Sequence, residues 1–309
     1  MKQWLETREV LDRLAELRRI GQRAALATVV RVRGSAYRHE GAKLLVAEDG
    51  TTTGNVSGGC LEQDVREVAL HVIRTGRPEL RNYCSSADEI AAWDLGVGCE
   101  GQVDVFVEPA LEPRPRERAL LDERRPFAVC SVMPATGETG KGRLIVTPDA
   151  VAGDLGSLDL NRAMTAWARA LLGTEQSGLH EIASHSIFCD VFLPPPQLAL
   201  CGAGDDARPL ARLAAEVGFR VIVVDRRPGF LTAERFPTAA GLVESDGAGL
   251  ARRAPLDEAR IYGPVGLDIG TDGAEQVALA VIAEILAVRS GRRADSLRER
   301  QASIHAPTE

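Results

Sequence analysis

The sequence predicts an α/β protein in which an N-terminal α+β domain is followed by a shortened, Rossmann-like C-terminal domain. Apolar runs of strand length alternate along the chain with segments whose apolar residues recur at helical spacing. Three consecutive prolines at 194–196 form a stiff, extended boundary, which divides the chain into domains of residues 1–193 and 194–309. Directly after the prolines, an apolar strand runs into a glycine-rich turn and an amphipathic helix, as expected of a Rossmann-type unit.

The composition restricts the classes of partner. The 37 basic and 44 acidic side chains give a formal net charge of −7, and no basic patch stands out, so neither nucleic acid nor an anionic membrane is an expected partner. No apolar run approaches the length of a membrane span, and the charged N-terminus does not resemble a signal peptide, so we expect a cytoplasmic protein. The six cysteines include no C-x-x-C pair, which argues against a structural zinc site and favours free thiols.

The N-terminal domain contains a glycine turn, Ser57-Gly58-Gly59, between a short strand and a helix that is predicted to begin at Cys60. Glycines turn backbone N–H groups outward, and a helix N-terminus carries a partial positive charge, so the turn suits an anion such as a phosphate. The same field favours the thiolate of Cys60. A structural interpretation competes with this one: Ser57 caps the helix, the glycines form a tight turn, and Cys60 is a small buried residue.

Two further features of this domain could take part in chemistry. Four potential cations lie within the loop 33–43, either as solvated surface charge or as a convergent anion pocket: Arg33, Arg38, His39 and Lys43. A second cysteine, Cys99, lies among glycines in the run 96–101. Two glycine-flanked thiols in one domain could hold a soft metal, a sulfur atom in transit, or each other.

The C-terminal domain carries a nucleotide-binding fingerprint. The turn has the form G-x-G-x-x-A, with Gly202, Gly204 and Ala207 at its fixed positions, and the next apolar strand ends in Asp225. This acid lies 23 residues after Gly202, near the spacing of a residue that binds the ribose of a dinucleotide. Few strands are expected beyond it, too few for two mononucleotide-binding halves, so the unit could bind NAD(P) or serve as a scaffold.

Five ordered segments of the sequence carry a family resemblance. They are RGSAYRHEGAKLLV (33–46), GNVSGGCLE (54–62), GVGCEG (96–101), the fingerprint segment 198–230 and GPVGLDIG (263–270). Together they resemble the XdhC/CoxI family, which comprises accessory proteins for the maturation of molybdenum hydroxylases such as xanthine dehydrogenase and carbon monoxide dehydrogenase. The resemblance spans nearly the whole chain, and the ordered set is more specific than any single motif.

The resemblance implies a homodimeric molybdenum-cofactor chaperone rather than a catalyst. Such a protein binds molybdopterin or the complete cofactor, helps a sulfur-donating desulfurase to equip it with its sulfido ligand, and delivers it to an apo molybdenum hydroxylase. Carried over to this sequence, the thiols that contact the metal and the sulfur are Cys60 and Cys99. The expected cofactor-binding residues are Ser57, Gly58, Gly59, Arg33, Arg38 and Lys43, and the Rossmann fingerprint contributes Gly202, Gly204, Ala207 and Asp225.

Two departures from the family pattern and two other functions remain open. Asp205 stands where relatives commonly carry histidine, and a segment that relatives have between the positions of Glu244 and Gly247 is absent. One alternative is an NAD(P)-dependent oxidoreductase that uses the C-terminal unit. The other is an assembly platform whose glycine turns are purely structural.

Overall fold

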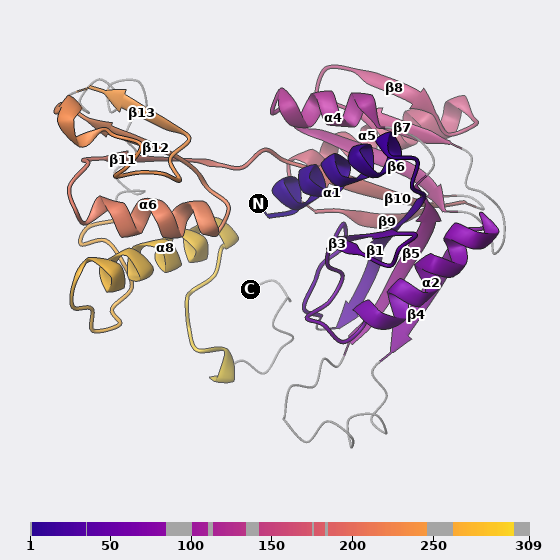
Figure 1. Cartoon of the computed structure of the whole chain (residues 1–309), viewed down its shortest axis with the longest axis horizontal. Coiled ribbons are helices and arrows are strands. Elements are labelled where there is room, and N and C mark those ends of the chain that lie inside the picture. Colours follow the sequence, from indigo (N-terminus) through magenta and orange to yellow (C-terminus); the bar gives the residue numbers. More distant parts are fainter. Residues whose placement is uncertain are drawn as a thin grey trace. The chain divides into compact units, whose positions relative to one another are not determined.

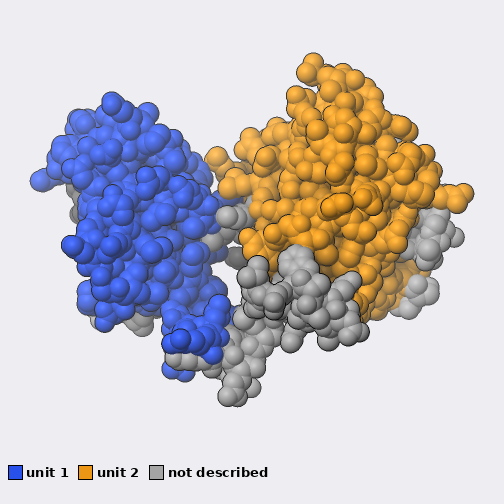
Figure 2. Space-filling view, turned by 60° about the horizontal axis from the view of Figure 1, so that its bottom comes forward, with its two compact units in different colours: residues 1–2, 195–309 blue, residues 3–194 orange. Residues whose placement is uncertain are grey.

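The computed structural model describes residues 2–34, 36–84, 101–110, 114–133, 142–174, 176–182, 185–245 and 262–299. The chain forms two compact units, shown in different colours in Figure 2. The N-terminal unit comprises residues 3–194, and the C-terminal unit comprises residues 195–309 together with residues 1–2. The division falls within the proline run 194–196.

Two five-stranded antiparallel sheets build the N-terminal unit (Figure 1). The first sheet has the order β3-β2-β1-β5-β4, with β1 (Ala24–Gly34), β2 (Lys43–Ala47), β3 (Thr52–Gly54), β4 (Glu79–Cys84) and β5 (Gly101–Pro109). The second has the order β8-β7-β6-β10-β9, with β6 (Phe127–Met133), β7 (Arg143–Val146), β8 (Val151–Asp154), β9 (Gly178–Ile182) and β10 (His185–Phe192).

Helices cover both faces of the first sheet, which explains the continuous apolar run in β1. Side chains alternate across a strand. Ala25, Ala27 and Val29 therefore point to the core beneath α2 (Glu62–Thr75), whereas Ala24 and Leu26 point to the core that contains α1 (Lys2–Arg19). A strand buried on both faces needs apolar residues at every position, as the first half of β1 has.

The core around α1 is shared by the two sheets. The ring of Phe127 from β6 stacks on Phe192 from β10 at 4.6 Å between ring centroids, and Trp4 from α1 meets Phe127 edge-on at 6.1 Å. A second helix, α4 (Pro115–Asp122), contributes Leu121 to the same core. The far face of the second sheet is covered by α5 (Leu158–Leu172), so the unit has the layer order α2, first sheet, α1 with α4, second sheet, α5.

The C-terminal unit contains a parallel sheet in the order β11-β12-β13, formed by β11 (Gln197–Cys201), β12 (Arg220–Asp225) and β13 (Gly241–Glu244). Its helices, α6 (Ala207–Glu216) and α8 (Ala274–Ser290), lie side by side in Figure 1 and share one core with the sheet. A strand–turn–helix–strand unit with parallel pairing is Rossmann-like, so the predicted α/β fold class is confirmed. Among the described residues, none of the helices has the length and apolar character needed to cross a membrane.

Candidate functional site

The glycine turn before α2 is held by its own side chains. Ser57 is buried, and its Oγ accepts hydrogen bonds from the N–H groups of Gly59 (3.0 Å) and Leu61 (3.1 Å) while donating to the carboxylate of Glu62. The same carboxylate accepts the N–H groups of Ser57 (2.8 Å) and Val56 (3.3 Å). Burial acts to raise the pKa of Glu62, but these hydrogen bonds outweigh it and leave the pKa lowered. Much of the turn's capacity to bind an anion is therefore used by the protein's own carboxylate.

The helix that follows the turn starts later than the sequence indicated. It begins at Glu62 rather than at Cys60, and Leu61 takes the N-cap position without a side-chain cap. The prediction that Cys60 is the first residue of a helix is therefore wrong, because Ser57 and Glu62 bond across the turn and keep it non-helical as far as Leu61. The thiol of Cys60 is exposed in this turn, which contradicts the competing view of a buried small residue.

The backbone explains one of the two glycines of the turn. Gly59 has φ = 118°, a backbone conformation that side chains rarely adopt. A Cβ at Gly58 would lie 3.4 Å from the ring of Tyr37, whose residue is 70% exposed. The turn thus carries the exposed thiol of Cys60, and its Gly58 lies next to the exposed ring of Tyr37.

The predicted basic pocket is divided among different partners. Arg33 Nη1 donates to Gln102 Oε1 (3.1 Å), and the guanidinium of Arg38 pairs with Glu6 of α1. The ammonium of Lys43 is buried and binds two oxygens described below. Cys99 lies outside the described residues, and within the described ranges no three His, Cys, Asp or Glu side chains are grouped to hold a metal ion.

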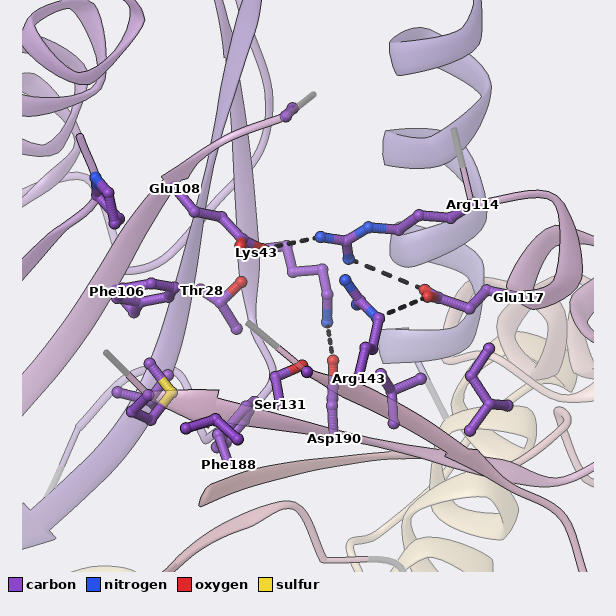
Figure 3. A pocket seen from close by; sticks show the side chains of 18 of the residues that line it. Thr28, Lys43, Phe106, Glu108, Arg114, Glu117, Ser131, Arg143, Phe188 and Asp190 are labelled. Carbon is purple, nitrogen blue, oxygen red and sulfur yellow. Dashed lines mark hydrogen bonds and ion pairs between the residues drawn. The ribbon is translucent and has the colours of Figure 1, made fainter. Parts of the chain in front are cut away.

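Lys43 lines a cavity that the sequence analysis did not predict. The cavity has a volume of about 470 Å³ and lies between the two sheets of the N-terminal unit (Figure 3). It continues the shared core, because side chains on one face of a strand follow each other at every second residue. On β1 the core residue Leu26 is followed by Thr28 and Val30, and on β6 Phe127 leads through Val129 to Ser131.

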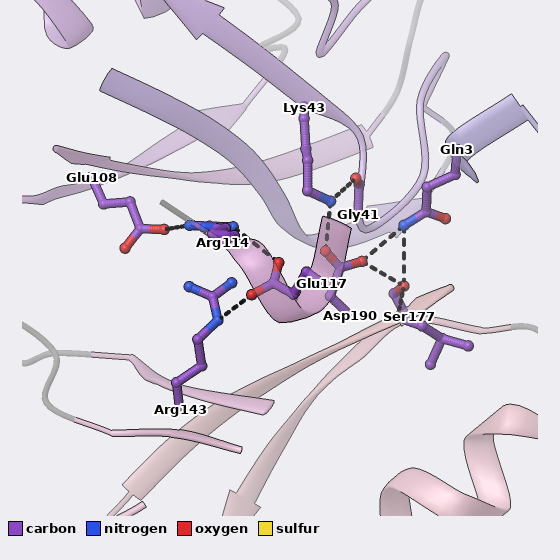
Figure 4. A network of polar contacts seen from close by, with 10 residues as sticks. Gln3, Gly41, Lys43, Glu108, Arg114, Glu117, Arg143, Ser177 and Asp190 are labelled. Carbon is purple, nitrogen blue, oxygen red and sulfur yellow. Dashed lines mark hydrogen bonds and ion pairs between the residues drawn. The ribbon is translucent and has the colours of Figure 1, made fainter. Parts of the chain in front are cut away.

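A network of partly buried ion pairs lines this cavity (Figure 4). Arg114 Nη2 lies 2.8 Å from Glu108 Oε1, and its Nη1 lies 3.8 Å from Glu117 Oε2. Burial by itself lowers the pKa of Arg114, but Glu117 and Glu108 outweigh it and raise the pKa. The guanidinium of Arg143 approaches the same Glu117, with Nε 3.0 Å from Oε1, and its pKa is lowered first by burial and then by the charge of Arg114.

The second pair of the network joins the two sheets. Lys43 Nζ lies 2.5 Å from Asp190 Oδ2 and 2.8 Å from the carbonyl oxygen of Gly41. Asp190 also accepts hydrogen bonds from Gln3 Nε2 (2.8 Å) and Ser177 Oγ (3.2 Å). Lys43 and Asp190 are 147 residues apart, so no local signal in the sequence could have paired them.

In the C-terminal unit, the fingerprint acid is already fully bonded. The carboxylate of Asp225 accepts the N–H groups of Ala203 and Arg227 (both 2.8 Å) and two bonds from the Arg227 guanidinium (3.0 and 2.9 Å). The side chain of Arg227 is the main cause that lowers the pKa of Asp225. Gly202 has a positive φ of 127°, a Cβ at Gly204 would lie 2.5 Å from the carboxylate of Asp206, and Ala207 is the first residue of α6. A carboxylate offers about four acceptor positions, so the chain itself occupies the positions that a ribose would use.

Comparisons with known proteins find matches in both units of this structure. The model of the XdhC and CoxI family matches residues 17–84, which include β1, β2, the Ser57 turn and α2, and the model of the XdhC Rossmann domain matches residues 198–253. A protein of Bacillus subtilis (strain 168), named as a probable xanthine dehydrogenase subunit, is 29% identical over 325 residues, covering 87% of this chain and 94% of that protein. That alignment is longer than the chain, so the relative has residues without a counterpart here.

Two further proteins are similar over different extents. The molybdenum cofactor insertion chaperone PaoD of Escherichia coli (strain K12) is 32% identical over 125 residues, which cover 40% of this chain and 38% of that protein. A crystal structure of a xanthine dehydrogenase from Bacillus halodurans has a TM-score of 0.70, with 24% sequence identity, over 93% of this chain and 97% of that chain, which shows a common fold. Family models thus match the turn-bearing sheet of one unit and the parallel sheet of the other, so this chain is similar to the XdhC and CoxI family in both units.

Proposed function

We propose that this protein is a molybdenum-cofactor chaperone that acts in the maturation of a molybdenum hydroxylase. The similarity to the XdhC and CoxI family supports a maturation role, and the similarity to a protein named as a molybdenum cofactor insertion chaperone supports a role in handling the cofactor. In this proposal a sulfur-donating desulfurase supplies the sulfido ligand, and an apo molybdenum hydroxylase in the cytoplasm receives the loaded cofactor. The chaperone acts as a homodimer, and its own residues bind, orient and protect the cofactor.

The observation that carries the proposal is the exposed thiol of Cys60 in the turn before α2. The turn lies within the segment matched by the family model, and Ser57 and Glu62 fix its backbone. A thiolate is a soft ligand that suits molybdenum or a sulfur atom in transit, and the exposed ring of Tyr37 beside Gly58 offers a face for a planar ring. When bound, the cofactor would supply the metal and its dithiolene sulfurs, while Cys60, with Cys99 as a second thiol, would hold the metal end.

The phosphate of the cofactor is not assigned to the N–H groups of Ser57. Glu62 accepts the N–H groups of Val56 and Ser57, and a phosphate there would also meet the negative charge of this carboxylate. Like charges in contact repel each other, so the turn as formed fits the metal end of the cofactor better than its phosphate. The proposal therefore keeps Cys60 as its central residue and leaves Ser57 to shape the turn.

Purification from a host that makes the cofactor tests this proposal. Molybdenum retained by the protein, measured by elemental analysis, should appear together with pterin fluorescence after oxidation. Cys60→Ser should lower the retained molybdenum by at least about tenfold, the scale of loss when a partner in a metal site is removed. Cys201→Ser, which changes another exposed thiol in the C-terminal unit, should leave retention unchanged. Equal retention by the wild type and Cys60→Ser would contradict the role of this thiol.

An NAD(P)-dependent oxidoreductase is the second candidate, and the Rossmann-like fold is the observation in its favour. The contacts of Asp225 argue against binding of a dinucleotide, because four donors of the chain already fill the acceptor positions of its carboxylate. Calorimetric titration with NAD+ and NADP+ separates the two functions. Micromolar binding that is lost in Asp225→Ala would favour the oxidoreductase, and no binding would leave the C-terminal unit as a scaffold or partner surface.

A further inference from the structure

The cavity between the two sheets is large enough for a small organic ligand. Its volume of about 470 Å³ lies within the range of roughly 300–1,000 Å³ that is usual for pockets that bind small molecules. Its lining comes from β1, β2, β5, α4, β6, β7 and β10, so both sheets and one helix contribute to its walls. None of its lining residues belongs to the turn 54–62, so the cavity is a different site from the one proposed for the metal end of the cofactor.

The two sides of the cavity differ in chemistry. Figure 3 shows the rings of Phe106 and Phe188 on one side and the side chains of Arg114, Glu117 and Arg143 on the other. Phenylalanine rings offer flat apolar faces that favour stacked or edge-on contact with another ring. The apolar side therefore suits a planar ring, and the charged side suits a polar substituent on that ring.

Two arginines that line the cavity keep donors for a ligand within the part of the chain that the structure describes: Arg116, which is exposed, and Arg143, which is partly buried. Lys43 binds Asp190 and Gly41, and Arg114 is held by two glutamates. Arg143 approaches Glu117 alone, and its Nε is not aligned for a hydrogen bond there. Its terminal nitrogens therefore have no partner among the described residues, although the side chain is only 35% exposed.

The charge balance of the cavity favours an anion. Four basic and three acidic side chains line it, namely Lys43, Arg114, Arg116 and Arg143 against Glu108, Glu117 and Asp190. Arg143 lies in surroundings that disfavour its positive charge, and a bound anion would relieve this by pairing with it. Because the guanidinium fork matches the two oxygens of a carboxylate or phosphate, an oxyanion is the best match.

We propose that this cavity binds a small planar-ring oxyanion, an aromatic or heteroaromatic ring that carries a carboxylate or phosphate group. The ring lies against Phe106 and Phe188, and the oxyanion pairs with the guanidinium of Arg143. The hydroxyls of Thr28 and Ser131 also line the cavity and can bond to heteroatoms of the ring. This site shares no residue with the turn around Cys60, so it can be tested apart from the proposed role of that thiol.

Calorimetric titration of the full-length protein with three probes tests this site. Benzoate and phenyl phosphate carry the required ring and charge, whereas benzamide has the same ring and no charge. Benzoate should bind at least about tenfold more tightly than benzamide, since a hydrogen bond to a charged group is worth more than a factor of ten in affinity. Arg143→Gln should remove this preference, and Arg143→Lys should restore part of it because lysine keeps the charge but not the fork.

Two controls separate the ligand site from general effects. Arg125→Gln removes an arginine that pairs with Asp149 on the surface of the same unit, and it should bind the probes like the wild type. Phe106→Ala should weaken benzoate and benzamide by the same factor, since it changes the ring contact and not the charge contact. Unchanged thermal unfolding, followed by tryptophan fluorescence, shows that each variant is folded.

Competition with released molybdenum cofactor identifies the source of the natural ligand. Displacement of phenyl phosphate would assign the cavity to the pterin phosphate of the cofactor, and a lack of displacement would assign it to a separate metabolite. Both results support a site for planar-ring oxyanions. The proposal is overturned if benzamide binds as tightly as benzoate, if none of the probes binds, or if Arg143→Gln keeps the preference for the anion. These titrations do not use molybdenum retention, so failure here leaves the role of Cys60 untouched.

Discussion

The ion pair of Lys43 and Asp190 allows the link between the two sheets of the N-terminal unit to be tested directly. Its side chains are 4% and 10% exposed, and Nζ lies 2.5 Å from Oδ2. Asp190→Asn keeps the volume of the side chain and removes the charge that faces Lys43. The variant leaves an ammonium group buried between the sheets without a counter-charge, while the carbonyl of Gly41 and the ring of Phe192, 4.9 Å away, remain beside it.

The expected loss in the free energy of unfolding depends on the contacts that Lys43 or Asp190 keeps when the other is replaced. Removing one member of a buried pair costs about 3–5 kcal/mol, and the remaining contacts of Lys43 place Asp190→Asn near the lower end, at about 3 kcal/mol. Lys43→Met should cost less, about 2 kcal/mol, because Asp190 keeps its hydrogen bonds from Gln3 and Ser177. The double variant no longer contains a buried unpaired charge and should also lose about 2 kcal/mol or less, which gives a coupling free energy of about 3 kcal/mol.

Urea unfolding followed by tryptophan fluorescence measures these changes in one unit. The three tryptophans, Trp4, Trp93 and Trp167, all belong to residues 3–194, so their signal reports the N-terminal unit alone. A loss of about 3 kcal/mol should lower the urea midpoint by roughly 1–1.5 M for a unit of this size. As a control, Glu48→Gln breaks the exposed pair with Arg23 and should cost less than about 1 kcal/mol. A midpoint unchanged by Asp190→Asn, or a coupling free energy near zero, would refute this account.

Three further predictions concern pH and the turn before α2. Hydrogen bonds from Arg227 lower the pKa of Asp225, so the C-terminal unit should lose stability as the pH falls below about 4, where this carboxylate gains a proton in the unfolded chain. Hydrogen exchange measures this loss, and it should be smaller in Asp225→Asn. Burial and the hydrogen bond to Asp64 raise the pKa of Tyr83, so the N-terminal unit should lose stability as the pH rises above about 10, where this phenol ionises in the unfolded chain. Thermal unfolding followed by fluorescence should show a smaller loss above this pH for Tyr83→Phe. Ser57→Ala removes the acceptor of two backbone N–H groups and should lower the free energy of unfolding by about 1 kcal/mol. Peptide mass mapping should then show faster alkylation of Cys60, the exposed thiol in the turn.

Local patterns in the sequence predicted part of the fold. The C-terminal fingerprint with its acid at Asp225 predicted a Rossmann-like unit, and the parallel pairing of β11 and β12 confirms it. The start of α2 was missed because Ser57 and Glu62 bond across five residues, a spacing that does not match the usual capping box. The clue was local, but it lay in a pair of side chains rather than in the periodicity of apolar residues.

The cavity could not be predicted because it depends on how the two sheets pack. Alternation along β1 and β6 shows which residues share a face, but not that these faces meet. Arg114 precedes α4 and Arg143 lies on β7, and their common partner Glu117 joins them only in the folded chain. Of the predicted basic loop, Lys43 alone lines this cavity.

The packing of Trp4 against Phe127 and Phe192 has a consequence for synthesis on the ribosome. The first helix emerges early, but its apolar face has no complete partner until β10 has been made near residue 192. At typical rates of 5–20 residues per second, this delay lasts roughly 10–35 s. During that time the nascent helix exposes an apolar face that helper proteins for nascent chains can bind, so yield in cells should depend on such helpers more than the stability of the finished unit suggests.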